Sequence, residues 1–310
     1  MPYRSDDLVS AVRMRCQLPT AANDGKFTDL NILELAYEEL LTYVLPEVRK
    51  ARGNYYVRSL DYTVASGVSD YNIPPRAQGA SLRDVTFLDP SGNGWSVPEI
   101  PLEDSDYYNS SGSTWWSTAY AYTIEGNKVR LRPEPTREGT LRLRYYERPG
   151  RLVPVSEAMK VTGFGPGANQ VQGDVPASWT NGDIFDSLSA DPTFDTFGMD
   201  APAIAVTPGV GGSIDFTDPY PSELAVGDYI ALATESPVVQ LTVELQPVLT
   251  SATVVRVLEA LGDLQGVGVA QAKMERQMGQ AVAHIQPRND GAQPRIINRH
   301  GPLRFSRRWQ

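Results

Sequence analysis

Apolar residues recur at helical spacing near the start of the chain. A first helix is expected over Asp6–Cys16, with Ser5 as its N-cap. A second helix is expected over Thr28–Arg52, capped by Thr28, with Pro46 kinking or interrupting it. One apolar stripe runs along this second helix and predicts that one of its faces is buried; its members are Leu33, Ala36, Tyr37, Leu40, Leu41, Val44 and Val48.

Helical spacing returns from about Leu241 and ends before Pro287. Gly262 separates two apolar stripes there, so we expect two further helices. The first stripe contains Leu245, Val248, Leu249, Ala252, Val255, Leu258 and Leu261, and the second contains Val267, Ala270, Met274, Ala281, Val282 and Ile285. Because amphipathic helices must bury their apolar faces, we expect the first pair, over Leu33–Val48, to pack against the last pair, over Leu245–Ile285.

Between the two helical parts, the pattern changes to alternation of apolar and polar residues. Apolar and polar residues alternate at Leu141–Tyr146, which predicts a strand of an antiparallel sheet with one buried face. Residues Tyr122–Leu131 predict a hairpin with Gly126 and Asn127 at its tip. Over Val153–Ser236 glycine and proline become dense, and we expect more β-structure with long loops.

The expected fold class is therefore α+β. It combines a four-helix domain built from both chain ends, an inserted antiparallel β-rich domain and an extended C-terminal tail. Residues 1–53 and 241–286 are assigned to the helical domain, and residues 54–240 to the inserted β-rich domain. Residues 287–310 are assigned to the extended basic tail, which has no usable period.

Charge divides the chain in the same way. The formal net charge is −9, but residues 287–310 hold six arginines and one acid, Asp290, and so carry +5. The remainder carries −14, because −9 minus +5 is −14. An acidic body is expected to repel nucleic acid within about one Debye length, ~8–10 Å at ordinary salt. No apolar stretch approaches the ~18 residues of a membrane span, so we expect a soluble protein made in the cytoplasm.

Residues that carry chemistry are sparse. The only histidines, His284 and His300, lack partners at metal-ligand spacing, and the single Cys16 allows no intrachain disulfide. No Gly-x-Ser-x-Gly elbow is present, and neither glycine-rich stretch is followed by the Lys-Ser/Thr of a phosphate loop. We therefore expect no catalytic residues, no cofactor and no metal, and a protein that is not an enzyme.

Three clusters leave alternatives open. Aspartates between Asp183 and Asp218 are interpreted as solvated loop residues, with calcium binding or glycosidase chemistry as alternatives. Trp115 and Trp116 are either an exposed contact patch or a plug at one end of the sheet. An arginine strip is interpreted as a salt-bridged face with Glu134, Glu138 and Glu147 nearby in sequence, rather than as a DNA contact; its members are Arg130, Arg132, Arg142 and Arg144.

The order of motifs resembles the head-to-tail adaptor (connector) proteins of tailed bacteriophages. The resemblance covers roughly Thr28–Val153 and Gly227–Gln310, whereas Val153–Val226 matches poorly and its role stays open. It rests on two helices followed by Asn54-Tyr55-Tyr56, Tyr71-Asn72-Ile73-Pro74, Leu82-Arg83-Asp84-Val85, Ile124-Glu125-Gly126-Asn127, Leu141-Arg142-Leu143-Arg144-Tyr145-Tyr146-Glu147-Arg148-Pro149, Gly227-Asp228-Tyr229-Ile230 and Gly301-Pro302-Leu303-Arg304.

The resemblance implies a structural virion protein in the neck, between capsid and tail. It implies a homo-oligomeric ring of twelve copies beneath the portal protein, with the helical domain forming the wall of the DNA channel. Genomic DNA would pass through without specific binding, and the β-rich part would face tail nozzle or fibre proteins. The tail would reach the portal, and its arginine forks and aromatic anchors are the expected docking residues: Arg295, Arg299, Arg304, Phe305, Arg307, Arg308 and Trp309.

Two other functions stay open at this point. The first is a DNA-binding assembly protein that uses the arginine-rich tail, a function that the −14 body opposes. The second is a carbohydrate-active or carbohydrate-binding module in the β-rich domain, since tyrosine, tryptophan and paired acids suit sugars. Salt-dependent binding of free DNA would favour the first, and loss of a glycan-directed activity on changing Asp183 would favour the second.

Overall fold

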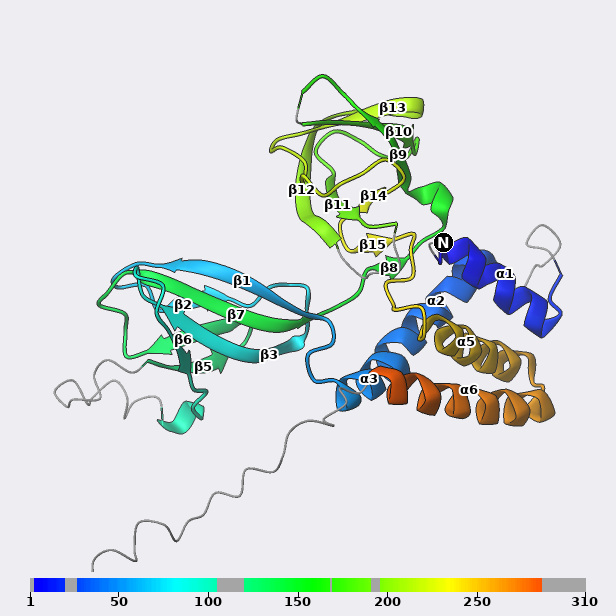
Figure 1. Ribbon diagram of the computed structural model, residues 1–310, viewed down its shortest axis with the longest axis horizontal. Coiled ribbons are helices and arrows are strands. Elements are labelled where there is room, and N and C mark those ends of the chain that lie inside the picture. Colours follow the sequence, from blue (N-terminus) through cyan, green and yellow to red (C-terminus); the bar gives the residue numbers. More distant parts are fainter. Residues whose placement is uncertain (1–2, 20–26, 105–119, 168, 191–195, 286–310) are drawn as a thin grey trace, which may run out of the picture.

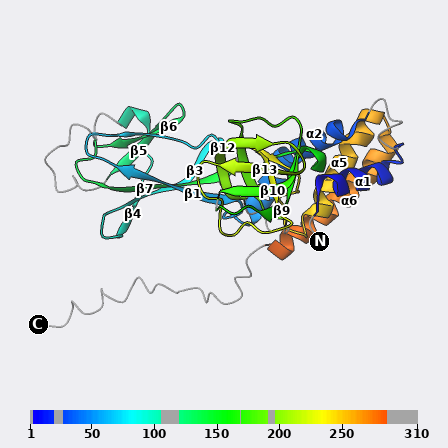
Figure 2. The same cartoon turned by 90° about the horizontal axis from the view of Figure 1, so that it is seen from above.

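The computed structural model describes residues 3–19, 27–104, 120–167, 169–190 and 196–285. The α+β class expected from the sequence is confirmed, with helices near both chain ends and strands between them (Figure 1). Helices and an elongated sheet region lie at opposite ends of the longest axis, and a β-barrel rises from the middle (Figures 1 and 2).

Helix α1 (Ser5–Cys16) is capped by Arg4 and not by Ser5 as expected. The backbone N–H of Arg4 donates to the Asp7 carboxylate at 3.1 Å, and the Arg4 guanidinium pairs with the same group at 3.2 Å. Ser5 is instead buried in the first turn, where its backbone N–H donates to the carbonyl of Pro237 at 2.9 Å. The start of the chain is therefore joined to the segment that leads into the last two helices.

Helix α2 (Asp29–Glu39), a π-helical segment (Leu40–Val44) and helix α3 (Leu45–Ala51) follow one another without a break. The Thr28 side chain accepts the backbone N–H of Asn31 at 3.2 Å, so the predicted cap is confirmed. In the π-helical segment the N–H of Leu45 reaches back five residues to the carbonyl of Leu40, directly before Pro46. The hydrogen-bond pattern thus changes where the proline predicts an interruption.

Helices α5 (Gln246–Leu261) and α6 (Leu264–Ile285) meet at Gly262, whose φ of 79° ends α5 in the left-handed region. Helix α5 packs against α1, α2 and α6, and α3 also contacts α6. The expected contacts between Leu33–Val48 and Leu245–Ile285 are therefore present. One core joins the two chain ends, and its fully buried members include Leu8, Val12, Ile32, Ala36, Leu40, Val44, Leu45, Val48, Leu245, Leu249 and Val257.

Two antiparallel sheets form the elongated region. The larger has the order β1-β7-β3-β4, and the smaller has the order β2-β6-β5. Strands β5 and β6 form the hairpin predicted around Gly126, which has a φ of 62°. Residues from both sheets share one core. The strand bounds are β1 (Val57–Val64), β2 (Asp70–Asn72), β3 (Ala77–Leu88), β4 (Gly94–Val97), β5 (Ala121–Glu125), β6 (Lys128–Arg132) and β7 (Gly139–Glu147).

A closed barrel stands where the sequence predicted only β-structure with long loops. Its strand order is β10-β13-β12-β11-β14-β9, and Trp179, Phe185 and Phe216 lie in its interior. Closure of the barrel brings the backbone of β10 close to that of β9 at Gly173. A Cβ atom at this position would lie only 2.3 Å from the carbonyl oxygen of Lys160, so a glycine is needed there. The strand bounds are β9 (Met159–Phe164), β10 (Gln170–Val175), β11 (Ile184–Leu188), β12 (Thr196–Thr207), β13 (Gly209–Phe216) and β14 (Tyr229–Leu232).

The chain enters and leaves the barrel through two short strands, β8 (Arg151–Leu152) and β15 (Glu235–Ser236). They pair in parallel, so the expectation of a purely antiparallel β-region is wrong at this point. A hydrogen bond from the N–H of Val153 to the carbonyl of Ser236, at 3.1 Å, extends the pairing by one residue. Short 3-10 helices at Leu102–Asp104 and Val155–Glu157 complete the described elements.

Candidate assembly sites

A buried ion pair joins the sheet region to the barrel. Arg76, in the turn before β3, donates to both carboxylate oxygens of Asp186 on β11 at 2.7 Å. Only 9% and 2% of these two side chains are exposed. Asp200 also accepts from Arg76 at 2.7 Å, and Asp186 accepts the backbone N–H groups of Asp200 and Thr234 at 3.0 and 2.9 Å. With these partners, both charged groups are extensively hydrogen-bonded despite their burial.

A second polar connection runs through Thr196 at the start of β12. Arg58 on β1 donates to the Thr196 carbonyl at 3.0 Å and pairs with Glu147 at 2.9 Å. Gln240 donates to the Thr196 hydroxyl at 3.1 Å and accepts the N–H of Gly150 at 2.8 Å. Burial raises the pKa of the Glu147 carboxyl, and the positive charges of Arg58 and Arg76 oppose that rise.

A third connection links the helices to the sheet. Arg49 on α3 donates to the Gln78 side chain and, at 3.1 Å, to the carbonyl of Glu147. Its guanidinium also lies over the Tyr146 ring, 4.7 Å from the centroid. Burial lowers the pKa of Arg49. We call these three connections together the polar junction; it holds the helices, the sheets and the barrel in one arrangement.

The polar junction was missed at the sequence level. Arg76 and Asp186 are 110 positions apart, so no periodic pattern or short motif connects them. Asp186 was interpreted only as one member of an acidic cluster. The one available signal was a charged residue, Asp186, inside an apolar strand with Ile184, Phe185 and Leu188 around it.

Asp183 of the predicted cluster is an acceptor in a turn, as is Asp228, which lies outside the cluster. Asp183 accepts the N–H of Thr180 at 2.7 Å, and Asp228 accepts those of Ala190 and Ala225, each at 2.8 Å. Within the part of the chain that the structure describes, no three His, Cys, Asp or Glu residues are grouped so as to hold a metal ion. Asp191 and Asp195 lie outside the described residues.

The arginine strip on the sheets is salt-bridged, as predicted. Its carboxylate partners come from neighbouring strands and hairpins and not from the glutamates close in sequence that were expected. Hydrogen bonds from arginine lower the pKa of Asp61 and of Asp70. The pairs are Arg142–Asp61 at 2.7 Å, Arg144–Asp84 at 2.8 Å, Arg130–Asp70 at 2.6 Å, Arg130–Glu125 at 2.7 Å and Arg132–Glu125 at 3.6 Å.

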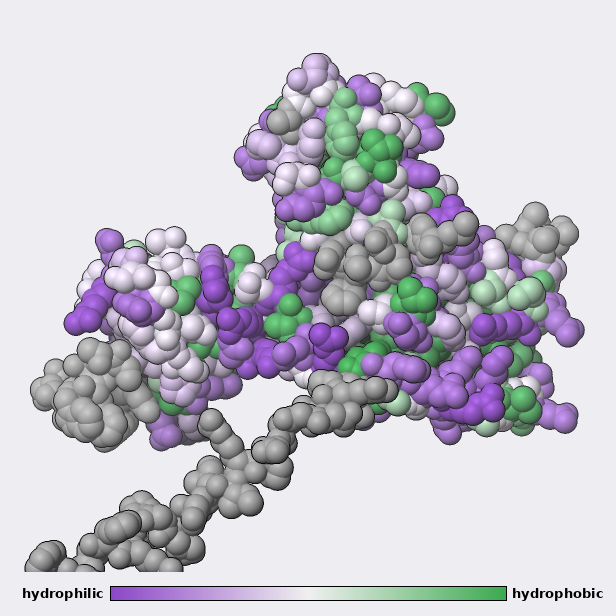
Figure 3. Space-filling model, viewed as in Figure 1, coloured by the Kyte–Doolittle hydropathy of each residue, from purple (hydrophilic) through white to green (hydrophobic). Residues whose placement is uncertain are grey.

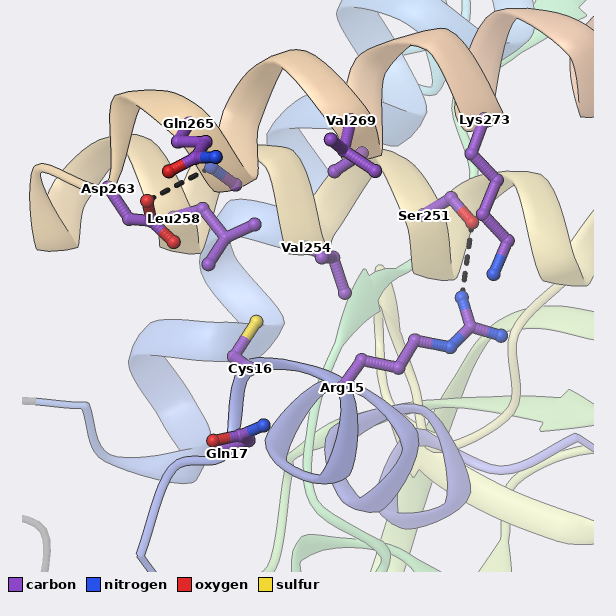
Figure 4. Close-up of a pocket in the computed structure, with 12 residues that line it drawn as sticks. Arg15, Cys16, Gln17, Ser251, Val254, Leu258, Asp263, Gln265, Val269 and Lys273 are labelled. Carbon is purple, nitrogen blue, oxygen red and sulfur yellow. Dashed lines mark hydrogen bonds between the residues drawn. The ribbon is translucent and has the colours of Figure 1, made fainter.

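A groove of about 640 Å³ lies among α1, α5 and α6 (Figure 4). Val254 and Leu258 line it from α5, and the Cys16 sulfur points toward them. Burial raises the pKa of the Cys16 thiol to about 11, so the thiol is protonated at neutral pH and is a poor nucleophile. Arg15 and Lys273 bring two cationic groups to the same groove. The groove can therefore accept apolar and acidic side chains, which is the chemistry of a docking site.

The predicted portal-docking residues cannot be placed in this arrangement. Arg295, Arg299, Arg304, Phe305, Arg307, Arg308 and Trp309 all lie outside the described residues, as do Trp115, Trp116 and His300. His284 is exposed near the end of α6.

The surface shows how polar and apolar residues are distributed. Hydrophilic residues cover much of the near face of the sheets and helices, whereas apolar residues gather on the near face of the barrel (Figure 3). Among the described helices, none is long and apolar enough to cross a membrane.

Comparison with models of protein families identifies a match. The family model described as SU10 adaptor protein matches residues 4–162, which is about half of the 310 residues. The match spans the first helices, both sheets and the first strand of the barrel. It includes Arg76 and Glu147 of the polar junction, and it ends before Asp186. No curated protein matches the chain.

Proposed function

Because the chain belongs to the SU10 adaptor protein family, we propose that it is a head-to-tail adaptor that binds as a ring beneath the portal of a tailed phage. The family match over residues 4–162 is the observation that carries this proposal. An adaptor of this kind is a structural protein of the virion neck, where it contacts portal and tail proteins. The finer proposal is a non-enzymatic ring of twelve copies that extends the DNA channel and attaches the tail.

In this proposal the two kinds of structure have different tasks. Residues 1–53 and 241–286 form the helical domain that builds the ring and the channel wall. The single core shared by both chain ends supports that division. The β-rich residues 54–240 face the tail nozzle or fibre proteins. The polar junction supports this task, because a protein that connects portal and tail must hold its own parts in a fixed arrangement.

The charge of the chain fits passage of DNA without binding. The body outside residues 287–310 carries −14, so a channel lined by it repels the phosphate backbone. The arginine strip on the sheets does not offset this effect, because its cations are paired with carboxylates.

The basic tail is proposed to dock on the portal. Its arginines can bind carboxylates in two-pronged fashion, and Phe305 and Trp309 can fill apolar pockets. In a ring, many weak tail contacts act together, so attachment gains strength from multivalency. The proposed docking residues are Arg295, Arg299, Arg304, Phe305, Arg307, Arg308 and Trp309.

Deletion of Pro302–Gln310 tests the docking role. The truncated protein is expected to keep its melting temperature, because the core of the helices lies elsewhere, and to lose binding to purified portal. A matched control replaces Arg276, an exposed arginine on α6, with alanine and is expected to bind normally. If the truncated protein assembles on the portal as well as the full chain does, the tail is not the docking arm.

The adaptor function itself is tested without any variant. Native mass spectrometry or electron microscopy of the full chain, with and without portal, is expected to show a ring bound to the portal. Failure of the two proteins to associate at any concentration tested would contradict the proposed function.

A further inference from the structure

The groove among α1, α5 and α6 has an exposed apolar rim. Val269 on α6, one of its lining residues, is 71% exposed, and the helices that border it carry two further exposed apolar residues, Leu264 on α6 (84%) and Met14 on α1 (75%). Apolar side chains that gather beside a concave surface are typical of a protein interaction site. The rim therefore needs a covering partner.

The charge of the groove restricts that partner. Arg15, which donates to the Ser251 hydroxyl at 3.1 Å, and Lys273 on α6 flank the apolar floor (Figure 4). Asp263 is the one carboxylate among the lining residues, and it is engaged at the start of α6, where it accepts the N–H of Gly266 at 2.9 Å. A complementary surface would carry an apolar side chain together with carboxylates.

The exposed face of α2 has this chemistry. Leu30, Glu34 and Glu38 follow one another at i, i+4 spacing and so share one face. Leu30 is 47% exposed, and both glutamates are exposed. Glu34 pairs with Arg151 of its own copy at 2.6 Å, so Glu38 is the carboxylate that this face offers to a partner. The buried residues of α2 pack in the core that α2 shares with α5, so this acidic–apolar face is turned away from α5. One copy therefore does not fill its own groove with its own α2 face.

We infer that the groove among α1, α5 and α6 binds the Leu30–Glu38 face of α2 of a second copy of this chain. The inference rests on the proposed ring and specifies the surfaces that close it. Because the two surfaces differ, the contact is heterologous, and a contact of this type closes into a ring when its rotation allows. The Glu38 carboxylate of one copy faces Arg15 and Lys273 of the next, and Leu30 covers the apolar floor.

Cross-linking tests the proximity directly. Because burial makes the Cys16 thiol a poor nucleophile, the groove is given a cysteine at the exposed lining residue Val269, and Cys16 is replaced by serine. The Cys16→Ser/Val269→Cys/Leu30→Cys variant, assembled alone or on portal and treated with a short bis-maleimide, is expected to give a ladder of covalent multimers. Cys16→Ser/Leu30→Cys lacks the groove cysteine and is expected to give none. Val210→Cys, at a 95% exposed position near the start of β13, is the matched control and is expected to give none.

A charge exchange tests the electrostatic part. Lys273→Glu places a carboxylate opposite carboxylates and is expected to weaken self-association roughly tenfold or more, measured by sedimentation. Adding Glu38→Lys to that variant is expected to restore most of the loss, which a merely destabilised helix would not do. Circular dichroism melting of each variant checks that the fold is retained.

The outcomes separate this inference from the proposed function. If rings form but the Cys16→Ser/Val269→Cys/Leu30→Cys variant gives no multimers and Lys273→Glu leaves assembly unchanged, the groove assignment is wrong and the adaptor function stands. If the full chain forms no oligomer either alone or on portal, the proposed ring fails and this inference fails with it.

Discussion

The Arg76–Asp186 pair shows how one contact can position two structural units. A buried ion pair pays a large desolvation cost and stabilises only when its remaining polar atoms also have partners. Here Asp186 accepts two backbone N–H groups besides the bidentate guanidinium, and Asp200 takes a further guanidinium proton. Removal of the Asp186 charge leaves the buried guanidinium with only the largely exposed Asp200 carboxylate as its anionic partner.

Asp186→Asn is therefore expected to lower the free energy of unfolding by about 3–5 kcal/mol, since it leaves Arg76 charged and under-paired. Urea unfolding followed by the fluorescence of the tryptophans, which include the buried Trp179 of the barrel, measures the loss. Asp61→Asn, which breaks the exposed pair with Arg142, is the control and is expected to have little measurable effect. Equal effects of the two changes would contradict a special role for the buried pair.

Glu147 and Asp61 are expected to have opposite effects on the pH dependence of stability. The pKa of Glu147 is raised above 4.5 in the folded protein. Its contribution to the free energy of unfolding is therefore fully present below pH 4.5 and is lost as the pH rises through the raised pKa. The pKa of Asp61 is lowered below 3.8 in the folded protein. Its contribution to the free energy of unfolding is therefore fully present above pH 3.8 and is lost as the pH falls through the lowered pKa.

We therefore expect Glu147→Gln to gain stability relative to the unmodified protein as pH rises from about 4 to about 7. Asp61→Asn is expected to lose relative stability as pH rises from about 2 to about 4. Melting temperatures of the three proteins across this range measure both trends. A Glu147→Gln curve parallel to that of the unmodified protein would show that burial does not perturb this carboxyl.

At the scale of the element, the helices were predictable because their signals are local. The Thr28 cap, the stripe through Leu33 and Leu40, and the stop at Gly262 each depend on residues within a few turns. The hairpin around Gly126 was predictable for the same reason. The cap of α1 was assigned one residue too late, because an arginine does not normally occupy that position and its pairing with Asp7 has no simple sequence signal.

The barrel was not predictable as a closed unit. Its closure depends on the pairing of β9 with β14 and of β10 with β13, which are distant in sequence. Its strands are interrupted by glycine, as at Gly173 and Gly212, and show register shifts, so regular alternation is weak. The polar junction was missed for a related reason, because its partners come from separate elements. The predicted docking residues in 287–310 lie outside the described residues, so they stay a prediction.

Truncation of Leu40 tests the core that joins the two chain ends. Leu40 is fully buried in the π-helical segment, and Leu40→Ala is expected to cost about 2–5 kcal/mol through lost burial and the cavity left behind. Leu258→Ala is the comparison, because Leu258 is only partly buried beside the groove, and a smaller loss is expected. Chemical denaturation followed by circular dichroism at a helical wavelength measures both. A larger loss at Leu258 would contradict the position of the core.

At the scale of the whole molecule, charge separates the adaptor from a DNA-binding protein. The tail carries +5, but it is attached to a body of −14. Full-length protein is therefore expected to show only weak binding to free duplex DNA, lost by about 0.15 M salt. Fluorescence anisotropy with labelled duplex over a salt series measures this, and the protein without Pro302–Gln310 is the control. Tight binding that persists at that salt would favour the DNA-binding alternative.

The core that joins the two chain ends also sets the order of events during synthesis. Helices α2 and α3 leave the ribosome early, but their partner α5 begins only at Gln246, after both sheets and the barrel have been made. At ~5–20 residues per second, the nascent chain exposes the stripe through Ile32 and Leu40 for on the order of ten seconds or more. During that interval the nascent chain is at its most exposed to chaperones and to aggregation, and the core of the helices is complete only after α5 has been released.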